Sequence, residues 1–220
     1  MGFAALIFDF DGVLLESEWA GNQQIADWLT AIGHPTSVEQ SMHKFMGLAG
    51  ADFIAAIERW IGGPIPADFH DARAEEDARA IAEGVEEVVG AVAFIRGLPA
   101  GLPKAICSSS SSHWVRSHLA NLGLEGAFGD MIFSGREHVA RGKPAPDLYR
   151  HAAAALGVPI GGVAIIEDSP VGVEGALASG ATVIGLVAGR HCLPGHAERL
   201  RALGVRHIAR NFDEVATLLA

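Results

Sequence analysis

Residues 6–14 read Leu-Ile-Phe-Asp-Phe-Asp-Gly-Val-Leu, and they decide the fold of this chain. The apolar run 3–8 and the glycine at position 12 are typical of a short buried strand that ends in a tight turn. Asp9 and Asp11 stand one residue apart at its end, so both side chains would point the same way if the strand continued.

Two carboxylates at this spacing repel each other, and a bound cation or one shared proton would relieve the repulsion. A site that offers only oxygen favours a hard cation such as Mg²⁺. An Asx turn at the strand end explains Asp9, Asp11 and Gly12 equally well without any site. The rest of the chain therefore has to decide between the two interpretations.

The segment after this strand is predicted to be entirely helical. Its apolar residues recur at helical spacing, and no strand pattern occurs before residue 84. Glycine and proline residues separate the predicted helices, which cover 17–32, 38–46, 50–61 and 67–81. We therefore expect an inserted helical domain at 16–83.

Strands and helices alternate from residue 84 onward, which predicts an α/β fold with a parallel sheet covered on both faces. The predicted strands after the first are 104–107, 131–133, 163–166, 182–187 and 206–209. The predicted helices are 85–98, 114–122, 147–156, 171–179, 195–203 and 213–219.

Polar residues follow the first four predicted strands, where ligands bind in such sheets. Asp9 and Asp11 follow the first strand, Ser108 the second, the Arg-Gly-Lys-Pro segment 141–144 the third, and Glu167 and Asp168 the fourth. The joint pattern favours a site much more strongly than any one of its parts.

Serines 108–112 precede a predicted helix, where helix capping explains them and an anion site is also possible. We interpret Ser108 as a phosphate ligand, with Ser109 and Ser110 as further substrate-binding residues. Lys143 is either a solvated surface lysine or a point charge for a phosphoryl oxygen, and the flanking glycine and proline favour the second role.

Glu167 and Asp168 either cap the next helix or bind a metal ion. Two acids directly after a buried strand resemble the first pair, so both are expected to face the same crevice. We interpret Asp168 as a metal ligand, and Glu167 as a ligand or as a partner that acts through water.

Composition limits the possible partners and the compartment. The net charge of −10 disfavours nucleic acid and anionic membranes as partners, and no apolar run is long enough to span a membrane. The N-terminus carries no signal-peptide pattern. Cys107 and Cys192 lie far apart without metal-type spacing, which predicts neither a disulfide framework nor a zinc site and suits a reducing cytoplasm.

These residues resemble the four motifs of the haloacid dehalogenase superfamily, in the branch similar to beta-phosphoglucomutase. The resemblance covers nearly the whole chain, with motifs at 9–13, at Ser108, at Lys143 and at 167–169. It implies a Rossmann-like core, here 1–15 and 84–220, and a helical cap domain, here 16–83. It also implies an aspartyl phosphate on Asp9, with Asp11 first as the acid and then as the base. Mg²⁺ would be held by Asp9, the Asp11 carbonyl and Asp168.

The cap domain of this family selects the substrate, and here the sequence agrees with the pattern only in part. His43 and Lys44 lie where relatives carry a basic and aromatic stretch; Lys44 is a candidate substrate ligand, whereas His43 is interpreted as a surface residue. Glu16 replaces the usual aspartate, and Gly21 stands where related phosphomutases place a histidine. The remaining histidines, among them His191 and His196, and the tryptophans are interpreted as structural.

The combined prediction is a Mg²⁺-dependent phosphatase that hydrolyses a small phosphorylated metabolite such as a sugar phosphate. A sugar phosphomutase is the alternative within the family, and dehalogenase chemistry is disfavoured because it does not need Asp11 as a proton donor. A receiver-type phosphoryl-accepting domain is the alternative from another class, although its acceptor follows a later strand. The sequence identifies no protein partner.

Overall fold

The computed structural model describes residues 2–46, 48 and 50–220, which form two compact units. The first unit combines the N-terminal segment up to Glu16 with Glu86–Ala220, and the second is Ser17–Val85. The predicted domain boundaries, after residues 15 and 83, lie one and two residues before these division points. We describe each unit by itself.

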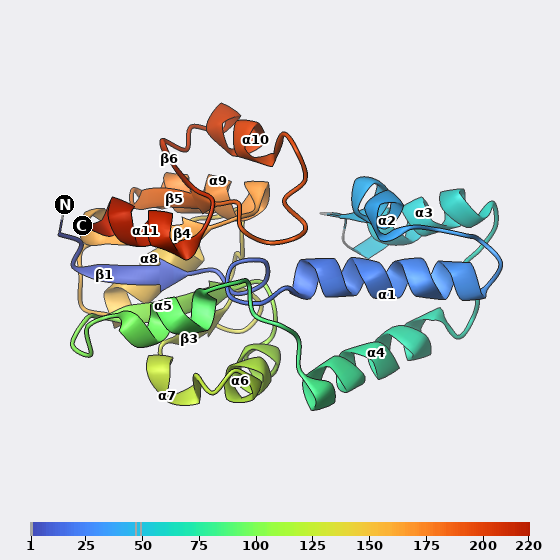
Figure 1. The fold of residues 1–220 in the computed structure, drawn as a ribbon, viewed down its shortest axis with the longest axis horizontal. Coiled ribbons are helices and arrows are strands. Elements are labelled where there is room, and N and C mark those ends of the chain that lie inside the picture. Colours follow the sequence, from blue (N-terminus) through green and yellow to red (C-terminus); the bar gives the residue numbers. More distant parts are fainter. Residues whose placement is uncertain (1, 47, 49) are drawn as a thin grey trace. The chain divides into compact units, whose positions relative to one another are not determined.

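The first unit is built on a six-stranded parallel sheet with strand order β3-β2-β1-β4-β5-β6 (Figure 1). The order runs outward from β1 in both directions, so the chain reverses its course across the sheet beside β1. The strands are β1 (Ala5–Phe8), β2 (Lys104–Ser108), β3 (Ile132–Ser134), β4 (Val163–Glu167), β5 (Thr182–Leu186) and β6 (His207–Ala209). This is the predicted Rossmann-like α/β fold, and the prediction is confirmed.

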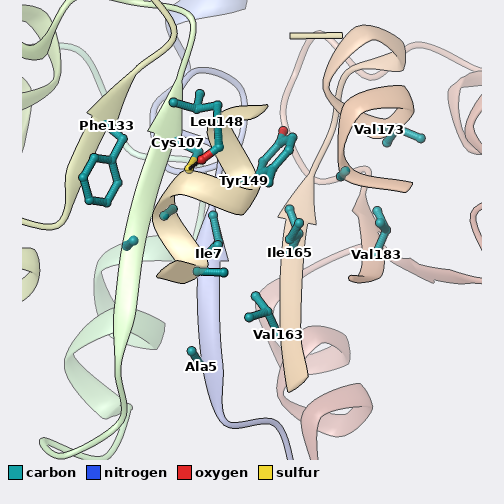
Figure 2. Packing of buried hydrophobic residues seen from close by; sticks show 14 of the residues in the cluster. Ala5, Ile7, Cys107, Phe133, Leu148, Tyr149, Val163, Ile165, Val173 and Val183 are labelled. Atoms are coloured by element: carbon teal, nitrogen blue, oxygen red, sulfur yellow. Dashed lines mark hydrogen bonds between the residues drawn. The ribbon is translucent and has the colours of Figure 1, made fainter. Parts of the chain in front are cut away.

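Alternate residues of the strands face opposite sides of the sheet, and each side is covered by helices. Ile7, Cys107 and Ile165 belong to a buried cluster with Leu148 and Tyr149 of helix α8 (Asp147–Ala155) (Figure 2). Helix α9 (Pro170–Ser179) packs against β4 and β5, and α10 (His196–Ala202) packs against α9. Aliphatic side chains on one strand face thus bury against helices as expected for a parallel sheet.

Four phenylalanine rings pack together on the opposite side of the sheet. The Phe8 ring makes edge contacts with Phe94 and Phe128 at centroid distances of 6.1 Å each. Phe94 lies on α5 (Ala91–Gly97) and stacks at 5.1 Å on Phe212 of α11 (Phe212–Leu219). Figure 1 shows α5 and α11 in front of the sheet and α8 behind it. The remaining elements of this unit are α6 (Ser112–Asn121), α7 (Glu125–Phe128) and the 3-10 turn η1 (Ile160–Gly162).

The second unit consists of helices in its described part. These are α1 (Ser17–Ala31), α2 (Val38–Phe45), α3 (Gly50–Ile61) and α4 (Phe69–Glu83). Leu29, Phe45 and Ile57 form the centre of its apolar cluster. A buried hydrogen bond of 2.9 Å from Ser41 Oγ to Asn22 Oδ1 fixes α1 against α2.

The prediction of a helix over 85–98 is wrong in its first half, because the helix starts only at Ala91. The preceding residues instead pair with the chain that leaves the sheet: Glu16 N donates to Glu86 O at 2.9 Å, and Val88 N donates to Leu14 O at 3.1 Å. The chain that returns from the second unit thus runs alongside the chain that leaves the sheet, and helical periodicity does not reveal such a non-local contact.

The short helix α7 was not predicted. Within the part of the chain that the structure describes, no helix has the length and apolarity needed to cross a membrane.

Candidate active site

Parallel pairing brings the predicted acidic motifs to one edge of the sheet. Phe8 is in register with Ile166 of β4 and with Ile106 of β2, so the residues that follow these strands lie side by side. Asp9 N donates to Ile166 O at 2.9 Å and continues the β1–β4 pairing by one step. The site therefore forms around the carboxyl ends of the two central strands, where the chain reverses its course across the sheet.

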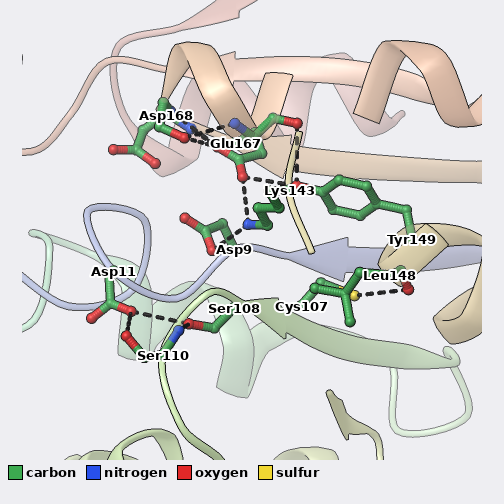
Figure 3. Close-up of polar contacts among 12 residues, drawn as sticks. Asp9, Asp11, Cys107, Ser108, Ser110, Lys143, Leu148, Tyr149, Glu167 and Asp168 are labelled. Carbon is green, nitrogen blue, oxygen red and sulfur yellow. Dashed lines mark hydrogen bonds and ion pairs between the residues drawn. The ribbon is translucent and has the colours of Figure 1, made fainter. Parts of the chain in front are cut away.

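Lys143 lies between the two acidic motifs (Figure 3). Its Nζ donates to Asp9 Oδ1 at 2.7 Å and to Glu167 Oε1 at 2.6 Å, and its side chain is only 3 % exposed. Burial alone lowers the pKa of Lys143, but the charges of Asp9 and Glu167 outweigh burial and raise the pKa well above its ordinary value. The lysine is therefore a fixed positive charge, and its interpretation as a solvated surface residue is wrong.

Glu167 is fully buried and is held by hydrogen bonds at both carboxylate oxygens. Oε1 accepts from Lys143 and, at 2.8 Å, from the Tyr149 hydroxyl. Oε2 accepts from the backbone N–H of Asp168 at 2.9 Å and from the N–H and Oγ of Ser169 at 3.0 and 3.1 Å. A carboxylate held in this way is suited to orient its neighbours rather than to enclose a metal ion itself, which favours the water-mediated alternative for Glu167.

Glycine at position 172 makes room for this carboxylate. A Cβ at Gly172 would lie 1.7 Å from Glu167 Oε1, so either α9 or the hydrogen-bonded carboxylate would have to shift. The sequence pattern indicates a close-packed helix start at this position, and the close neighbour is the Glu167 side chain.

Asp168 is 2 % exposed and offers one unsatisfied oxygen. Its Oδ2 lies 2.7 Å from His191 Nε2, and its backbone carbonyl lies 2.6 Å from His196 Nε2. Its Oδ1 is buried and has no hydrogen-bond partner among the described residues. Gly12 has φ +81°, and a Cβ there would lie 2.3 Å from Asp168 Oδ2, so both the turn and the close approach require glycine.

The charges of the cluster match those needed to hold one divalent cation. Carboxylate oxygens of Asp9, Glu167 and Asp168 lie within 4.8 Å of one another, and Lys143 supplies one positive charge. Three negative charges and one positive charge leave two negative charges. Burial raises the pKa of Asp9 and of Asp168, and the neighbouring charge of Glu167 raises both further. These oxygen donors and the unsatisfied Asp168 Oδ1 fit a hard cation such as Mg²⁺.

Asp11 does not point toward the same neighbours as Asp9. Its Oδ2 accepts from Ser110 Oγ at 2.7 Å and from Ser108 Oγ at 3.1 Å, and its Oδ1 accepts from Trp114 Nε1 at 3.0 Å. Figure 3 shows the Asp11 carboxylate turned toward these serines. Ser108 is buried and also accepts from Ser110 N at 2.9 Å, so in this conformation it holds Asp11 in place.

The other predicted ligands lie at the margin of the site or in the second unit. Ser109 is exposed beside the Asp11 contacts, and Ser111 caps α6 by accepting from Trp114 N. Lys44 and His43 are exposed on α2 of the helical unit. A role of Lys44 in substrate binding remains a prediction.

Four contacts of the site were missed by sequence reasoning. Trp114 was interpreted as structural and Tyr149 was not singled out, yet each donates a hydrogen bond to a carboxylate of the site. His191 and His196 were interpreted as structural, yet both lie against Asp168. A spacing signal was absent for all four, because helices and a loop bring them in from distant parts of the chain.

The comparisons with known proteins agree with this geometry. The family model described as haloacid dehalogenase-like hydrolase matches residues 3–180. Hexitol phosphatase A of Escherichia coli is 32 % identical over 186 residues, which cover 83 % of this chain and 82 % of the relative.

Two solved structures extend the similarity to the complete fold. A haloacid dehalogenase-like protein from Agrobacterium tumefaciens is 33 % identical with a TM-score of 0.89, covering 99 % of this chain and 98 % of the other. A HAD family hydrolase from Deinococcus radiodurans, with bound phosphate and sodium, is 33 % identical with a TM-score of 0.85, covering 99 % and 95 % of the two chains.

Proposed function

Because this chain belongs to the haloacid dehalogenase-like hydrolase family, we propose that it is a Mg²⁺-dependent phosphatase that acts on a small phosphorylated metabolite. The observation that carries the proposal is the buried cluster of Asp9, Lys143, Glu167 and Asp168, in which three carboxylates face one lysine and Asp168 Oδ1 has no hydrogen-bond partner among the described residues. The phosphatase among the relatives and the phosphate in a related structure support the same chemistry.

Asp9, Asp168 and the backbone carbonyl of Asp11 would hold Mg²⁺, which would neutralise charge on the transferring phosphoryl group. The Asp9 carboxylate attacks phosphorus, a new P–O bond to Asp9 forms, and the bond to the ester oxygen breaks. Asp11 gives its proton to the leaving oxygen, and then takes a proton from the water that cleaves the aspartyl phosphate. Inorganic phosphate leaves, Asp9 is again a free carboxylate, and Asp11 again carries the proton with which it began.

Lys143 and Glu167 would support these steps through position and charge. Lys143 aims the Asp9 carboxylate through its hydrogen bond and lowers the Asp9 pKa, which burial and the charge of Glu167 raise. Glu167 holds Lys143 from the other side and accepts the N–H of Asp168. Asp11 must leave its contacts with Ser110 and Trp114 to reach the leaving oxygen, which frees Ser108 and Ser110 for phosphoryl oxygens.

We further propose that Ser17–Val85 is the cap domain that selects the substrate, with Lys44 as a candidate ligand. The similarity to a hexitol phosphatase favours a sugar or sugar-alcohol phosphate as the substrate.

The free thiols of Cys107 and Cys192 suit a reducing compartment such as the cytoplasm.

The test is a screen of phosphate esters with the whole protein and Mg²⁺, in which Asp9→Asn serves as the matched inactive variant. We expect steady release of phosphate from several esters, loss of release in excess chelator, and a loss of more than about a thousandfold in the variant. A single stoichiometric phosphorylation without turnover would support the receiver-type alternative. Activity of Asp9→Asn within about tenfold of wild type would exclude Asp9 as the nucleophile.

The phosphomutase alternative makes a different product. A mutase needs a group that assists a sugar hydroxyl, and Gly21 on α1 cannot move a proton. With a sugar 1-phosphate and a trace of its bisphosphate, phosphorus NMR should show inorganic phosphate as the main product. Accumulation of the 6-phosphate isomer with little free phosphate would establish the mutase instead.

A further inference from the structure

Three nitrogen and sulfur donors gather beside the proposed magnesium site. His191 and Cys192 lie in the loop between β5 and α10, and His196 is the first residue of α10. One donor atom from each lies within 4.8 Å of the other two. His191 and His196 are buried and Cys192 is half-buried, so the group forms an enclosed cluster rather than an exposed set of side chains.

The distance between Cys192 and His191 suits two ligands of a tetrahedral metal ion. Cys192 Sγ lies 3.4 Å from His191 Nε2. Two ligands on one tetrahedral Zn²⁺, at the usual Zn–S and Zn–N bond lengths, stand about 3.5 Å apart. Asp168 Oδ2 lies at a hydrogen-bond distance of 2.7 Å from His191 Nε2, and the two atoms would have to move about 0.6 Å apart for Asp168 to serve as a fourth ligand. Together with Asp168, the cluster offers four donors, which is the ligand number of a closed zinc site.

The loop that carries these donors is fixed before any metal binds. Arg190 N donates to both carboxylate oxygens of Glu16, at 3.0 and 3.2 Å, and Cys192 N donates to Gly189 O at 2.9 Å. A Cβ at Gly189 would lie 2.6 Å from the His191 ring, so the loop is packed tightly against that imidazole. Little conformational entropy would be lost when a metal ion binds here.

The donor types determine which metals bind. Imidazole and thiolate favour zinc and other borderline or soft ions, whereas Mg²⁺ prefers the carboxylates of Asp9 and Asp168. We propose that His191, Cys192 and His196 form a second metal site for zinc-like ions, which recruits Asp168 and thereby withdraws it from the magnesium site. The ion displaces the Cys192 thiol proton and forms a metal–sulfur bond. Zinc would therefore inhibit the enzyme while magnesium activates it.

Cobalt is the probe for the site itself, since tetrahedral Co²⁺ bound to a thiolate absorbs in the near ultraviolet and visible. We expect one equivalent of Co²⁺ to give the thiolate charge-transfer band in the wild-type protein, and Zn²⁺ to remove it. Cys192→Ala and Cys192→Ser should lack the band. Cys107→Ala is the matched control, because Cys107 is buried beneath α8 and should leave the band unchanged. A band that persists in both Cys192 variants, or that is absent from wild type, would overturn the proposal.

Zinc inhibition tests the link to Asp168. With Mg²⁺ and an aryl phosphate, the zinc concentration for half inhibition should rise at least about tenfold in Cys192→Ala, while activity without zinc stays unchanged. Equal inhibition of both proteins would show that zinc acts at the magnesium cluster and would refute the inhibitory role. Cobalt binding needs no turnover, so its outcome stands apart from that of the proposed phosphatase activity.

Discussion

Magnesium should stabilise the folded protein, and it should do so more strongly as the pH rises. The site holds three buried carboxylates and one lysine, so acidic groups outnumber the lysine by two, and the His191 ring contacts Asp168. The pKa values of Asp9 and Asp168 are raised, so the folded state binds more protons than the unfolded chain above about pH 4. Their contribution to the stability of the metal-free protein is therefore present at low pH, and it is lost as the pH rises through the raised pKa values.

The size of the effect follows from mass action. Mg²⁺ at about a hundred times its Kd adds about 2.7 kcal/mol to the free energy of unfolding. In a chain of 220 residues, this corresponds to a rise in Tm of about 5–10 °C. The rise should be largest near about pH 8 and small near about pH 5, where protons replace the metal ion.

Calorimetry with and without Mg²⁺ over this pH range measures the effect, and Asp168→Asn is the critical variant. It removes one of the two excess charges and one ligand, so we expect its metal-free Tm to equal or exceed that of wild type and its Mg²⁺ shift to vanish. Asp130→Asn is the control, since this exposed carboxylate lies outside the cluster. A Mg²⁺ shift that is retained in Asp168→Asn, or that does not grow with pH, would refute the reasoning.

Three further predictions address the acid, the space around Glu167 and the contacts of Asp11. Asp11→Asn should slow the hydrolysis of alkyl phosphates far more than that of activated aryl phosphates, and equal losses in steady-state assays would exclude Asp11 as the acid. Gly172→Ala should cost about 1–3 kcal/mol in urea unfolding and should also lower kcat, because the added Cβ meets the Glu167 carboxylate. Gly21→Ala on α1 is the control, because a Cβ there meets nothing within 4 Å, and it should be neutral or stabilising. An equal loss of stability in Gly172→Ala and Gly21→Ala would contradict the argument. Trp114→Phe keeps a smaller aromatic ring and removes the donor to Asp11, and should cost at least about 1–2 kcal/mol in the same assay; an unchanged midpoint would show that this hydrogen bond contributes nothing.

The sheet was predictable because each strand is a short apolar run that is buried on both faces of the sheet. All six predicted strands are present in one parallel sheet, and the acidic motifs meet because the carboxyl ends of parallel strands share one edge. The prediction of a helix over 85–98 was wrong because a distant contact decides the structure of its first residues. These residues are apolar enough for a helix, but they pair with Leu14 and Glu16. Sequence periodicity carries information about local structure, and this contact joins segments about seventy residues apart.

The same distinction separates the predicted site residues from those that were missed. Asp9, Lys143 and Asp168 lie in motifs whose neighbours already suggest chemistry. Tyr149 and Trp114 lie within helices where an aromatic residue is most simply explained by packing, and only the tertiary structure brings their polar atoms to Glu167 and Asp11. A buried tyrosine or tryptophan usually needs a hydrogen-bond partner, but the sequence does not say which one it finds.

Glu167 and Asp168 differ in how the hydrogen bonds of their carboxylates are satisfied. Glu167 has hydrogen bonds at both oxygens, whereas Asp168, the next residue, keeps Oδ1 buried without a partner among the described residues. An unsatisfied buried carboxylate oxygen costs a folded protein about 1–3 kcal/mol or more. The surrounding contacts of Lys143, Tyr149 and Ser169 hold the cluster together despite that cost. Filling the vacant position with a protein donor would stabilise the metal-free fold and at the same time remove the oxygen that we propose for Mg²⁺. Stability of the metal-free protein and metal-dependent activity should therefore oppose each other at Asp168.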